Sequence, residues 1–297
     1  MATLRDIRNR IAGVTSIQKI TSAMKMVSSI KSRRAQKQAE SARPFNRKIN
    51  EILSVLISSR DEQLLEHPLL QPSKDAVRNV AIIVIAGDKG MCGSFNNNLL
   101  KFVDAYLHTE FKEQYPDAIP HLILIGTKPV DYYKKRSHDI LKTFPNAFQT
   151  IDYAMIEDIH DLVVKDFING KIDRVSVFFN KFINIMKQVP TNQPLLPVTL
   201  DPSLMEANTG NIDYIFEPNK QEILNTLLNQ YIDLNIWVPV LESNAAEQAA
   251  RLIAMDMATK NAKDLIGELE LQYNNARQAA ITTEMLEIVG GSESLRK

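Results

Sequence analysis

The hydrophobic pattern at the start of the chain predicts one very long helix. Between residues 3 and 58 apolar residues recur every three or four positions, and only Gly13 and Pro44 disturb the pattern. We expect these apolar side chains to follow one slowly drifting face of the helix: Ile7, Ile11, Val14, Ile17, Ile20, Met24, Val27 and Ile30. About 55 residues would give ~80 Å of helix. A bend or weak point is expected at Pro44, whose nitrogen cannot donate to the carbonyl of Glu40.

A second helical pattern begins near Lys220 and lasts almost to the end of the chain. Its first stretch is marked by Ile223, Leu227, Leu228 and Ile232, and Pro239 is expected to interrupt it. The second stretch is marked by Ala245, Ala249, Leu252, Ala262, Leu265, Leu269, Tyr273, Ala276 and Ala280. Gly290 and Gly291 predict its end. Residues 240–289 would be ~75 Å long, and two helices of similar length at opposite chain ends predict one antiparallel coiled coil.

The middle of the chain alternates between apolar strands and helical patterns. Strands are predicted at residues 80–86, 121–125 and 173–179, the last open to continuation towards Met186, with a candidate fourth at 195–200. Helices are predicted at 95–113, 128–137 and 156–169. Strands and helices that alternate at this spacing favour an α/β layer with parallel strands.

Composition narrows the class of protein. The 44% hydrophobic and 24% charged content is typical of a folded protein. No segment approaches the roughly 20 apolar residues that span a bilayer, and the first residues contain no apolar signal segment. We therefore expect any membrane association to come through partners. The single cysteine, Cys92, excludes an internal disulfide and a Cys-rich zinc site.

The net charge is zero, but the charges are unevenly distributed. Residues 1–60 carry a net +10, residues 61–239 a net −7 and residues 240–297 a net −3. A basic N-terminal arm indicates an acidic partner, which could be nucleic acid, anionic lipid or an acidic protein loop. Phe45 is the only aromatic residue among the first 60, and this disfavours base stacking. A nucleic-acid-binding coiled coil nevertheless stays open as an alternative.

The segment most typical of an enzyme is a glycine-rich turn at residues 87–96, between a predicted strand and a predicted helix. The spacing of Gly87, Gly90 and Gly93 matches neither the P-loop nor the dinucleotide fingerprint. A tight strand-to-helix turn is favoured, and a nucleotide-binding α/β enzyme with a coiled-coil arm stays open as a second alternative. Cys92 has no neighbouring histidine and is expected to be a small buried residue. Ser94 lacks the flanking glycines of a nucleophile elbow.

The histidines give no metal signal. His67, His108, His121, His138 and His160 show no paired spacing. We therefore predict no catalytic residue, no metal site and no cofactor in this chain.

Both chain ends resemble the gamma subunit of F-type ATP synthases. The resemblance rests on residues 5–11 (RDIRNRI), 17–27 (IQKITSAMKMV), 41–45 (SARPF), 246–255 (AEQAARLIAM), 273–284 (YNNARQAAITTE) and 287–289 (EIV). Residues 88–96 (DKGMCGSFN) are similar to the family's central turn, although the family often has Leu-Cys-Gly-Gly-Leu there. With Cys92 alone, the dithiol switch of chloroplast members cannot exist.

The resemblance implies a non-catalytic central stalk that couples ion flow to ATP synthesis. Its coiled coil would turn inside a hexamer of alpha and beta subunits, and its α/β domain would rest on the membrane c ring beside the epsilon subunit. Met24 and Lys25 would face the acidic lever loop of beta. The upper shaft would touch the catch loops of the hexamer through Arg277, Gln278, Thr282 and Glu284.

The resulting prediction is an α/β fold class with an antiparallel coiled coil of the N- and C-terminal helices and a Rossmann-like α/β domain. Residues 1–60 form the N-terminal shaft helix, 75–216 the α/β domain and 220–290 the C-terminal shaft helix. The resemblance places the chain as a peripheral protein on the cytoplasmic face of a bacterial inner membrane. The apparent lack of a transit peptide favours a bacterial source.

Overall fold

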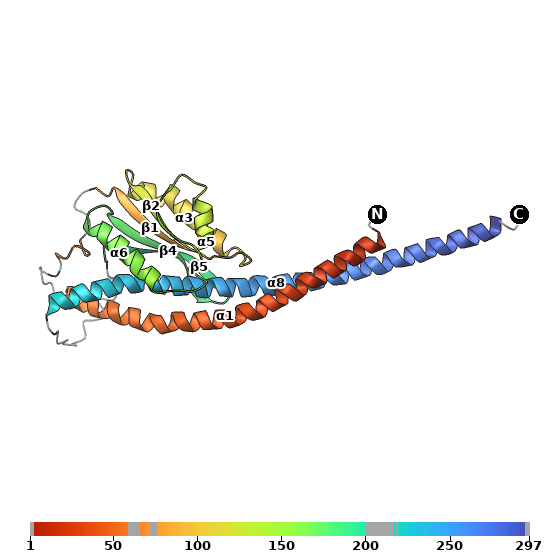
Figure 1. Ribbon diagram of the computed structural model, residues 1–297, viewed down its shortest axis with the longest axis horizontal. Helices are drawn as coiled ribbons and strands as arrows, with labels where there is room; N and C mark the ends of the chain where they lie inside the picture. Colours follow the sequence, from red (N-terminus) through yellow and green to blue (C-terminus); the bar gives the residue numbers. More distant parts are fainter. Residues whose placement is uncertain are drawn as a thin grey trace. The chain divides into compact units, whose positions relative to one another are not determined.

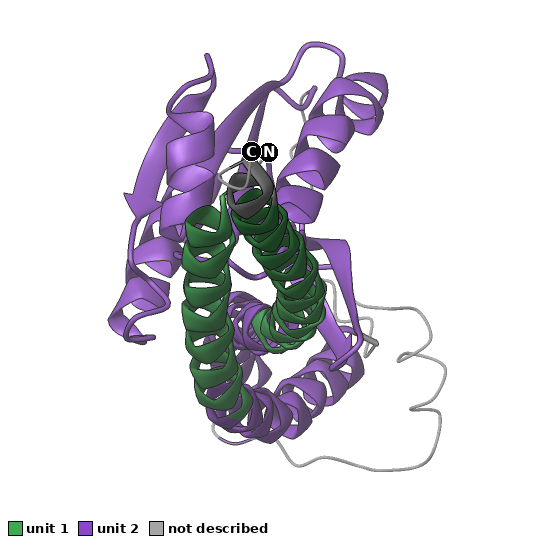
Figure 2. Cartoon of the chain, turned by 90° about the vertical axis from the view of Figure 1, so that its right-hand side faces the viewer, with its two compact units in different colours: residues 1–29, 251–297 green, residues 30–250 purple. Residues whose placement is uncertain are grey.

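The chain forms two compact units in a computed structural model that describes residues 3–58, 64, 66–71, 76–199, 217 and 219–294. Unit 1 consists of Met1–Ser29 and Arg251–Lys297, and unit 2 of Ile30–Ala250 (Figure 2). The helices α1 (Leu4–Ser58) and α8 (Lys220–Ser294) contribute to both units (Figure 1). The unit boundaries cut these helices, and the predicted division into residues 1–60, 75–216 and 220–290 stays a prediction.

Side chains cap the first turns of both long helices. The Oγ1 atom of Thr3 accepts from the backbone N–H of Asp6 at 3.3 Å, and the Asp6 carboxylate accepts from the Thr3 backbone N–H at 3.0 Å. Asn219 and Glu222 are linked at the start of α8, where the Glu222 N–H donates to Asn219 Oδ1 at 2.9 Å. These reciprocal bonds satisfy donors that have no partner within the helix.

The expectation that Pro239 interrupts the C-terminal helix is wrong, because α8 is one helix of 75 residues. Pro239 removes one backbone donor, but the part of α8 that leads up to it and passes through it carries fully buried side chains, at Leu228, Ile232, Ile236 and Val240. Burying such side chains stabilises by about 1.5–3 kcal/mol each, which outweighs the ~3 kcal/mol cost of an internal proline. Bends at Pro44 and Pro239 stay predictions.

The predicted end of this helix at Gly290 and Gly291 is also wrong, since α8 continues to Ser294. Glycine allows the left-handed conformation that ends many helices, but it does not require it.

Within unit 1 the two helices run antiparallel, as predicted. Near the N-terminus, Arg8 donates to the hydroxyl of Tyr273 at 2.6 Å. Further along α1, Thr259 Oγ1 donates to Thr21 Oγ1 at 2.9 Å. As residue numbers rise in α1 they fall in α8, so these contacts fix the direction of the pair.

The predicted α1 seam is only partly correct. Ile7, Ile11, Val14 and Met24 are half-buried, whereas four others are exposed by half or more: Ile17, Ile20, Val27 and Ile30. The buried positions are instead small or polar residues: Thr21, Ser28, Ser32, Ala35 and Ala39. Residues spaced alternately four and three positions apart follow the 3.5-residue period of a coiled coil and stay on its seam. Residues reached by repeated spacings of three, such as Ile17 and Ile20, rotate away from the seam.

The predicted α8 seam is largely confirmed. Ala245, Ala249, Ala262 and Leu269 are buried, and the other marked positions up to Ala276 are half-buried. Ala280 is exposed. The many alanines leave room for close packing of helices within each unit.

Unit 2 contains a five-stranded sheet in the order β3-β2-β1-β4-β5. The strands are β1 (Asn79–Ile85), β2 (Ile119–Ile125), β3 (Asp139–Phe144), β4 (Arg174–Asn184) and β5 (Lys187–Leu196). The helices between them are α3 (Phe95–His108), α4 (Glu110–Gln114), α5 (Thr127–Tyr133) and α6 (Ala154–Ile168). The first four strands are parallel, as predicted, and β5 pairs antiparallel with β4.

Sequence patterns missed part of this sheet. Strand β3 was not predicted, because its mixed sequence DILKTF is only half-buried at the sheet edge. The candidate strand at 195–200 lies instead at 187–196. This edge strand is half-buried and contains polar residues and two prolines, so it lacks the apolar pattern from which a strand is predicted. The helix predicted at 95–113 is divided into α3 and α4.

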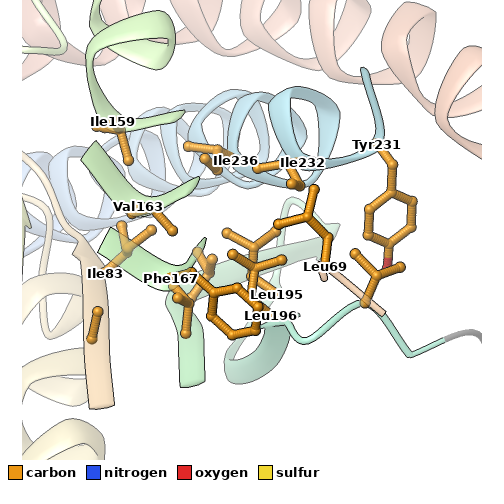
Figure 3. Close-up of a cluster of buried hydrophobic side chains, with 14 of the residues drawn as sticks. Leu69, Ile83, Ile159, Val163, Phe167, Leu195, Leu196, Tyr231, Ile232 and Ile236 are labelled. Atoms are coloured by element: carbon orange, nitrogen blue, oxygen red, sulfur yellow. The ribbon is translucent and has the colours of Figure 1, made fainter. Parts of the chain in front are cut away.

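Two hydrophobic layers enclose the sheet. One face packs against α3 and α5 around Val103 and Tyr133. The other packs against α6 and the part of α8 near Ile232 and Ile236 (Figure 3). The first part of α8 is therefore a component of the α/β core, and its position is fixed by the sheet.

An ion pair joins α6 to α8 at the edge of this core. His160 Nδ1 and Asp233 Oδ1 lie 2.8 Å apart, and the two side chains are 14% and 21% exposed. The contact with Asp233 raises the pKa of His160 despite the opposing effect of burial. Burial and the same carboxylate raise the pKa of Tyr153 to about 12.

The His160–Asp233 pair should give the stability of the chain a pH dependence. Because the folded pKa of His160 is raised above 6.5, its contribution is full below that pH and is lost as pH rises through the folded value. Urea unfolding should show that the free energy of unfolding of wild type exceeds that of His160→Gln by a pH-dependent part of at most about 1 kcal/mol below pH 6.5, and this part should shrink as the pH rises through the raised pKa of His160. Asp233→Asn should abolish this dependence, and a difference that grows with pH would contradict the assignment.

Candidate functional site

The glycine-rich turn at 87–96 follows β1 at the carboxyl edge of the parallel strands, where α/β proteins bind ligands. Its Asp88 is almost fully buried. One carboxylate oxygen accepts from the backbone N–H of Thr127 at 2.9 Å, and the other accepts from that of Phe148 at 2.8 Å. The Asp88 side chain thereby links the loops after β1, β2 and β3. It also occupies two backbone N–H groups that could otherwise bind an anion.

Helix α8 fills the remaining space beside this turn. Ser243 Oγ donates to the carbonyl of Ile85 at 3.2 Å. Glu247 is 3% exposed, and its carboxylate lies so near Gly87 that a Cβ there would meet Glu247 Cδ at 2.8 Å. The carboxylate of the chain itself therefore stands where a phosphate would approach the turn. This packing favours the tight-turn interpretation over a nucleotide site at residues 87–96.

Cys92 is buried, as predicted for a small structural residue. Its Sγ accepts from the side-chain amide of Asn96 at 3.3 Å, and Asn96 also accepts from the backbone N–H of Gly87 at 2.9 Å. Cys92 packs in a cluster with Ala245, Ala249 and other residues. The turn is thus held by side-chain bonds and by α8.

The five histidines lie in unit 2. His121 contacts Asp139 through one ring nitrogen and Asn79 through the other. Burial lowers the pKa of His67 and of His138. Within the described ranges, no group of three His, Cys, Asp or Glu residues could hold a metal ion.

The two predicted contact residues of α1 lie in unit 1 beside α8. Met24 is half-buried, and Lys25 forms an ion pair with Asp256 at 2.5 Å. Both charged side chains of this pair are about half exposed, so the pair contributes at most about 1 kcal/mol. Lys25 can therefore exchange Asp256 for another carboxylate at small cost. Met26, 65% exposed, is more accessible than Met24.

The predicted contact residues of α8 lie near its end and are all exposed: Arg277, Gln278, Thr282 and Glu284. Thr282 Oγ1 donates to the Gln278 carbonyl at 2.9 Å. The structure brings these four onto one short stretch of helix.

Apolar residues in the same stretch were missed by the sequence prediction. Every side chain from Arg277 to Val289 is exposed, and these include large apolar ones: Ile281, Met285, Leu286, Ile288 and Val289. In Figure 1, α8 continues past the start of α1 within unit 1. The sequence signal was present, because apolar residues continue at helical spacing from Ile281 to Val289.

Comparison with known proteins decides the family. The ATP synthase family model matches residues 3–295. The ATP synthase gamma chain of Chlorobium phaeobacteroides is 42% identical over 296 residues, covering 100% of both chains. That of Chlorobium chlorochromatii is 41% identical and covers 99% of both. This chain belongs to the ATP synthase gamma chain family.

Solved structures share the fold of this gamma-family chain. A chain of the Euglena gracilis mitochondrial ATP synthase (OSCP/F1/c-ring, rotational state 3) is 19% identical, with a TM-score of 0.64 and coverage of 98% of this chain and 94% of that one. A chain from the central stalk and c ring of the Tetrahymena thermophila enzyme is 23% identical, with a TM-score of 0.58 and coverage of 80% and 99%. Among the described residues, none of the gamma chain's helices is long and apolar enough to cross a membrane.

Contact between Gly87 and Glu247 predicts a position-specific cost for an added methyl group. Gly87→Ala should lower the free energy of unfolding by about 1–3 kcal/mol, because Glu247 is buried and cannot turn away into solvent. Gly90→Ala is the matched control, since a Cβ there meets nothing within 4 Å. Urea titration of both variants measures this. Equal effects at the two glycines would show that α8 does not pack closely on the turn.

Proposed function

We propose that this gamma chain is the central rotor of the F1 sector of an ATP synthase. In this role α1 and α8 form an asymmetric shaft within a hexamer of alpha and beta subunits. Ion flow through a membrane c ring would turn the shaft and drive each beta subunit through its nucleotide-binding conformations. The chain would carry no catalytic residue, and the chemistry would take place in the partner subunits.

The observation that carries this proposal is the exposed apolar end of α8. Five large apolar side chains between Ile281 and Val289 are 47–67% exposed. Burial of one such side chain is worth about 1.5–3 kcal/mol, so covering this end would stabilise an assembly by several kcal/mol. A helix end of this kind indicates a surrounding partner, and the hexamer is the partner that gamma-chain membership suggests.

The positive charge of α1 supports an acidic partner for the part of the shaft around Lys25. Basic side chains are exposed through the helix, and Lys25 has only a weak exposed ion pair to give up. Weak, exchangeable contacts suit a surface that must pass three beta subunits in turn, because a deeply bound contact would hold the rotor in one position. We accordingly propose that Met24 and Lys25 meet the acidic lever loop of beta.

The upper contacts are proposed for the exposed end of α8. Arg277, Gln278, Thr282 and Glu284 supply polar groups on the stretch that contains the exposed apolar residues. In the assembly they would meet the catch loops of the hexamer. The polar residues would set the position of the loops, and the apolar residues would exclude water.

The membrane connection is proposed through partners. Unit 2 would rest on the c ring beside the epsilon subunit, so that the chain takes part in hydrogen ion transport while remaining peripheral. The cytoplasmic face of a bacterial inner membrane is the proposed location. Curated relatives from Chlorobium species support a bacterial setting.

Reconstitution tests the rotor proposal directly. The purified chain mixed with alpha and beta subunits should form one complex with much higher ATP hydrolysis than alpha and beta alone. Leu286→Asp should weaken this assembly, because it places a charge in the covered apolar end. The variant should leave the urea midpoint of the isolated chain unchanged, because Leu286 is 67% exposed.

Ile168→Asp is the matched control for this experiment. Ile168 is 55% exposed, lies at the end of α6 in unit 2 and is not one of the residues proposed to contact the hexamer. It should assemble and support hydrolysis as wild type does. Failure of the wild-type chain to form any complex would reject the rotor proposal, and equal behaviour of the two variants would reject the covered end of α8.

Crosslinking tests rotation itself. Met24→Cys, in a Cys92→Ala background, is oxidised to a disulfide with a cysteine placed in the lever loop of beta. Turnover should stop because the shaft can no longer pass from one beta subunit to the next, and reduction should restore it. The same gamma variant with cysteine-free beta should keep turning over under oxidation. Undiminished turnover in the fully crosslinked complex would contradict a rotating role.

A further inference from the structure

One stretch of α1 in unit 2 lacks the buried residues found before and after it. Ala39 and Ile49 are buried, but none of residues 40–48, all of which the structure describes, is buried. A coiled-coil seam that passes through Ala39 and Ile49 at alternating spacings of three and four would continue through Ala42 and Asn46. Both of these side chains are only half-buried. The stretch corresponds to ~13 Å of helix.

Cavities lie between α1 and α8 along this stretch. One of about 550 Å³ is lined by Asn46 of α1 and Pro239 of α8, and by residues of the β4–β5 hairpin. Another of about 470 Å³ is lined by Ala42 of α1 and by Trp237 and Leu241 of α8. Within residues 40–48, α1 is therefore not held against α8 by buried apolar side chains of its own.

Arg43 makes directed polar contacts in the same stretch. Its Nε and Nη2 atoms lie 3.0 and 2.9 Å from Oε1 of Glu242 on α8, whose side chain is 7% exposed. The Nη2 atom also donates to the carbonyl of Phe182 in β4 at 3.1 Å. Phe182 is itself buried in a cluster with Ala35 of α1 and Ala246 of α8. One guanidinium group thus joins α1 both to α8 and to the hairpin.

The hairpin has a separate bond to α8 through its second strand. Gln193 Nε2 in β5 donates to Asn235 Oδ1 at 2.8 Å. Asn235 is buried, and its own side-chain amide donates to the carbonyl of Tyr231 at 2.8 Å. The hairpin is therefore attached to α8 independently of α1, and Arg43 attaches α1 to both.

Hydrogen bonds can fix an orientation that apolar burial leaves free. Hydrophobic stabilisation depends on the area removed from water and has no direction, so two helices can slide or turn against each other while the buried area changes little. A planar guanidinium group that reaches acceptors on two elements permits one arrangement. A lysine would keep the charge but lose the planar set of donors.

We propose that Arg43 is a positioning residue of the rotor, which fixes α1 against α8 and the β4–β5 hairpin so that torque passes between the α/β domain and both helices of the shaft. This inference rests on the proposed rotor function. Without the Arg43 contacts, α1 turns or slides against α8 when the shaft is loaded. Unloaded turnover in the hexamer continues, because the contacts proposed for the hexamer lie elsewhere on the shaft.

Distance measurement by pulsed electron spin resonance on the purified full chain tests the positioning itself. Spin labels at Glu40→Cys and Lys187→Cys, in a Cys92→Ala background, report the distance between α1 and the hairpin. Arg43→Met should broaden the distribution of this distance, because the side chain that joins the two elements is lost. Arg43→Lys should broaden it less, since the charge remains beside Glu242.

Arg47→Met is the matched control for both Arg43 variants. Arg47 lies about one turn further along α1 and lines the same 550 Å³ cavity, but its ion pair is with Glu51 of its own helix. The control should keep the wild-type distance distribution. If Arg43→Met fails to fold, Arg43→Lys against this control still decides the matter.

Torsional stiffness tests the consequence for the rotor. In the reconstituted complex with alpha and beta subunits, a bead attached at Lys187→Cys reports the angular fluctuation of the α/β domain while the hexamer is fixed to a surface. Arg43→Met should widen this fluctuation and leave the rate of ATP hydrolysis at the wild-type value. Arg47→Met should match wild type in both measurements.

Three results would overturn the proposal. They are wild-type distance distributions in both Arg43 variants, equal broadening by Arg47→Met, and an unchanged angular fluctuation in Arg43→Met. A lower urea midpoint with unchanged distributions would mean that Arg43 stabilises the chain without positioning α1. Failure of the wild-type chain to form a complex would reject the rotor function instead, and the spin-label distances of the isolated chain would still show whether Arg43 fixes α1.

Discussion

The structure depends most on the close packing of α8 against the carboxyl edge of the sheet in unit 2. Ala245, Ala246 and Ala249 are fully buried there, and Glu247 lies against Gly87. Small side chains let the helix backbone approach the turn, and polar contacts fix its position along the edge. A rotor needs this property, because a helix can transmit torque to a domain only if the helix cannot slip or rotate against it.

The same packing fills the place where this type of fold usually binds a ligand. An open parallel sheet presents a ligand crevice at this edge, and here α8 occupies it while Asp88 takes the backbone donors of two neighbouring loops. The gamma chain thus keeps a Rossmann-like arrangement but uses the crevice to hold its own helix.

In the coiled coil, unlike in the α/β core, large apolar side chains are exposed and small polar ones are buried. In unit 1 small polar residues such as Thr21 and Ser28 face the seam, and large apolar residues such as Ile17 and Ile20 face outward. This reversal gives up part of the hydrophobic stabilisation within the pair and leaves apolar surface for partners. Together with the exposed end of α8, it gives the shaft apolar surface that the chain itself does not cover.

The sequence by itself determined the two long helices, their antiparallel pairing, the three main parallel strands and the family. These features follow from long-range periodicity, buried β-branched runs and distinctive end motifs, and a single chain displays all of them. Only the tertiary structure decided which side chains form the seam, that α8 passes through Pro239 unbroken, and that β3 and β5 complete the sheet. At those positions local propensity is weak or opposed, and contacts between residues far apart in sequence supply the larger free energy.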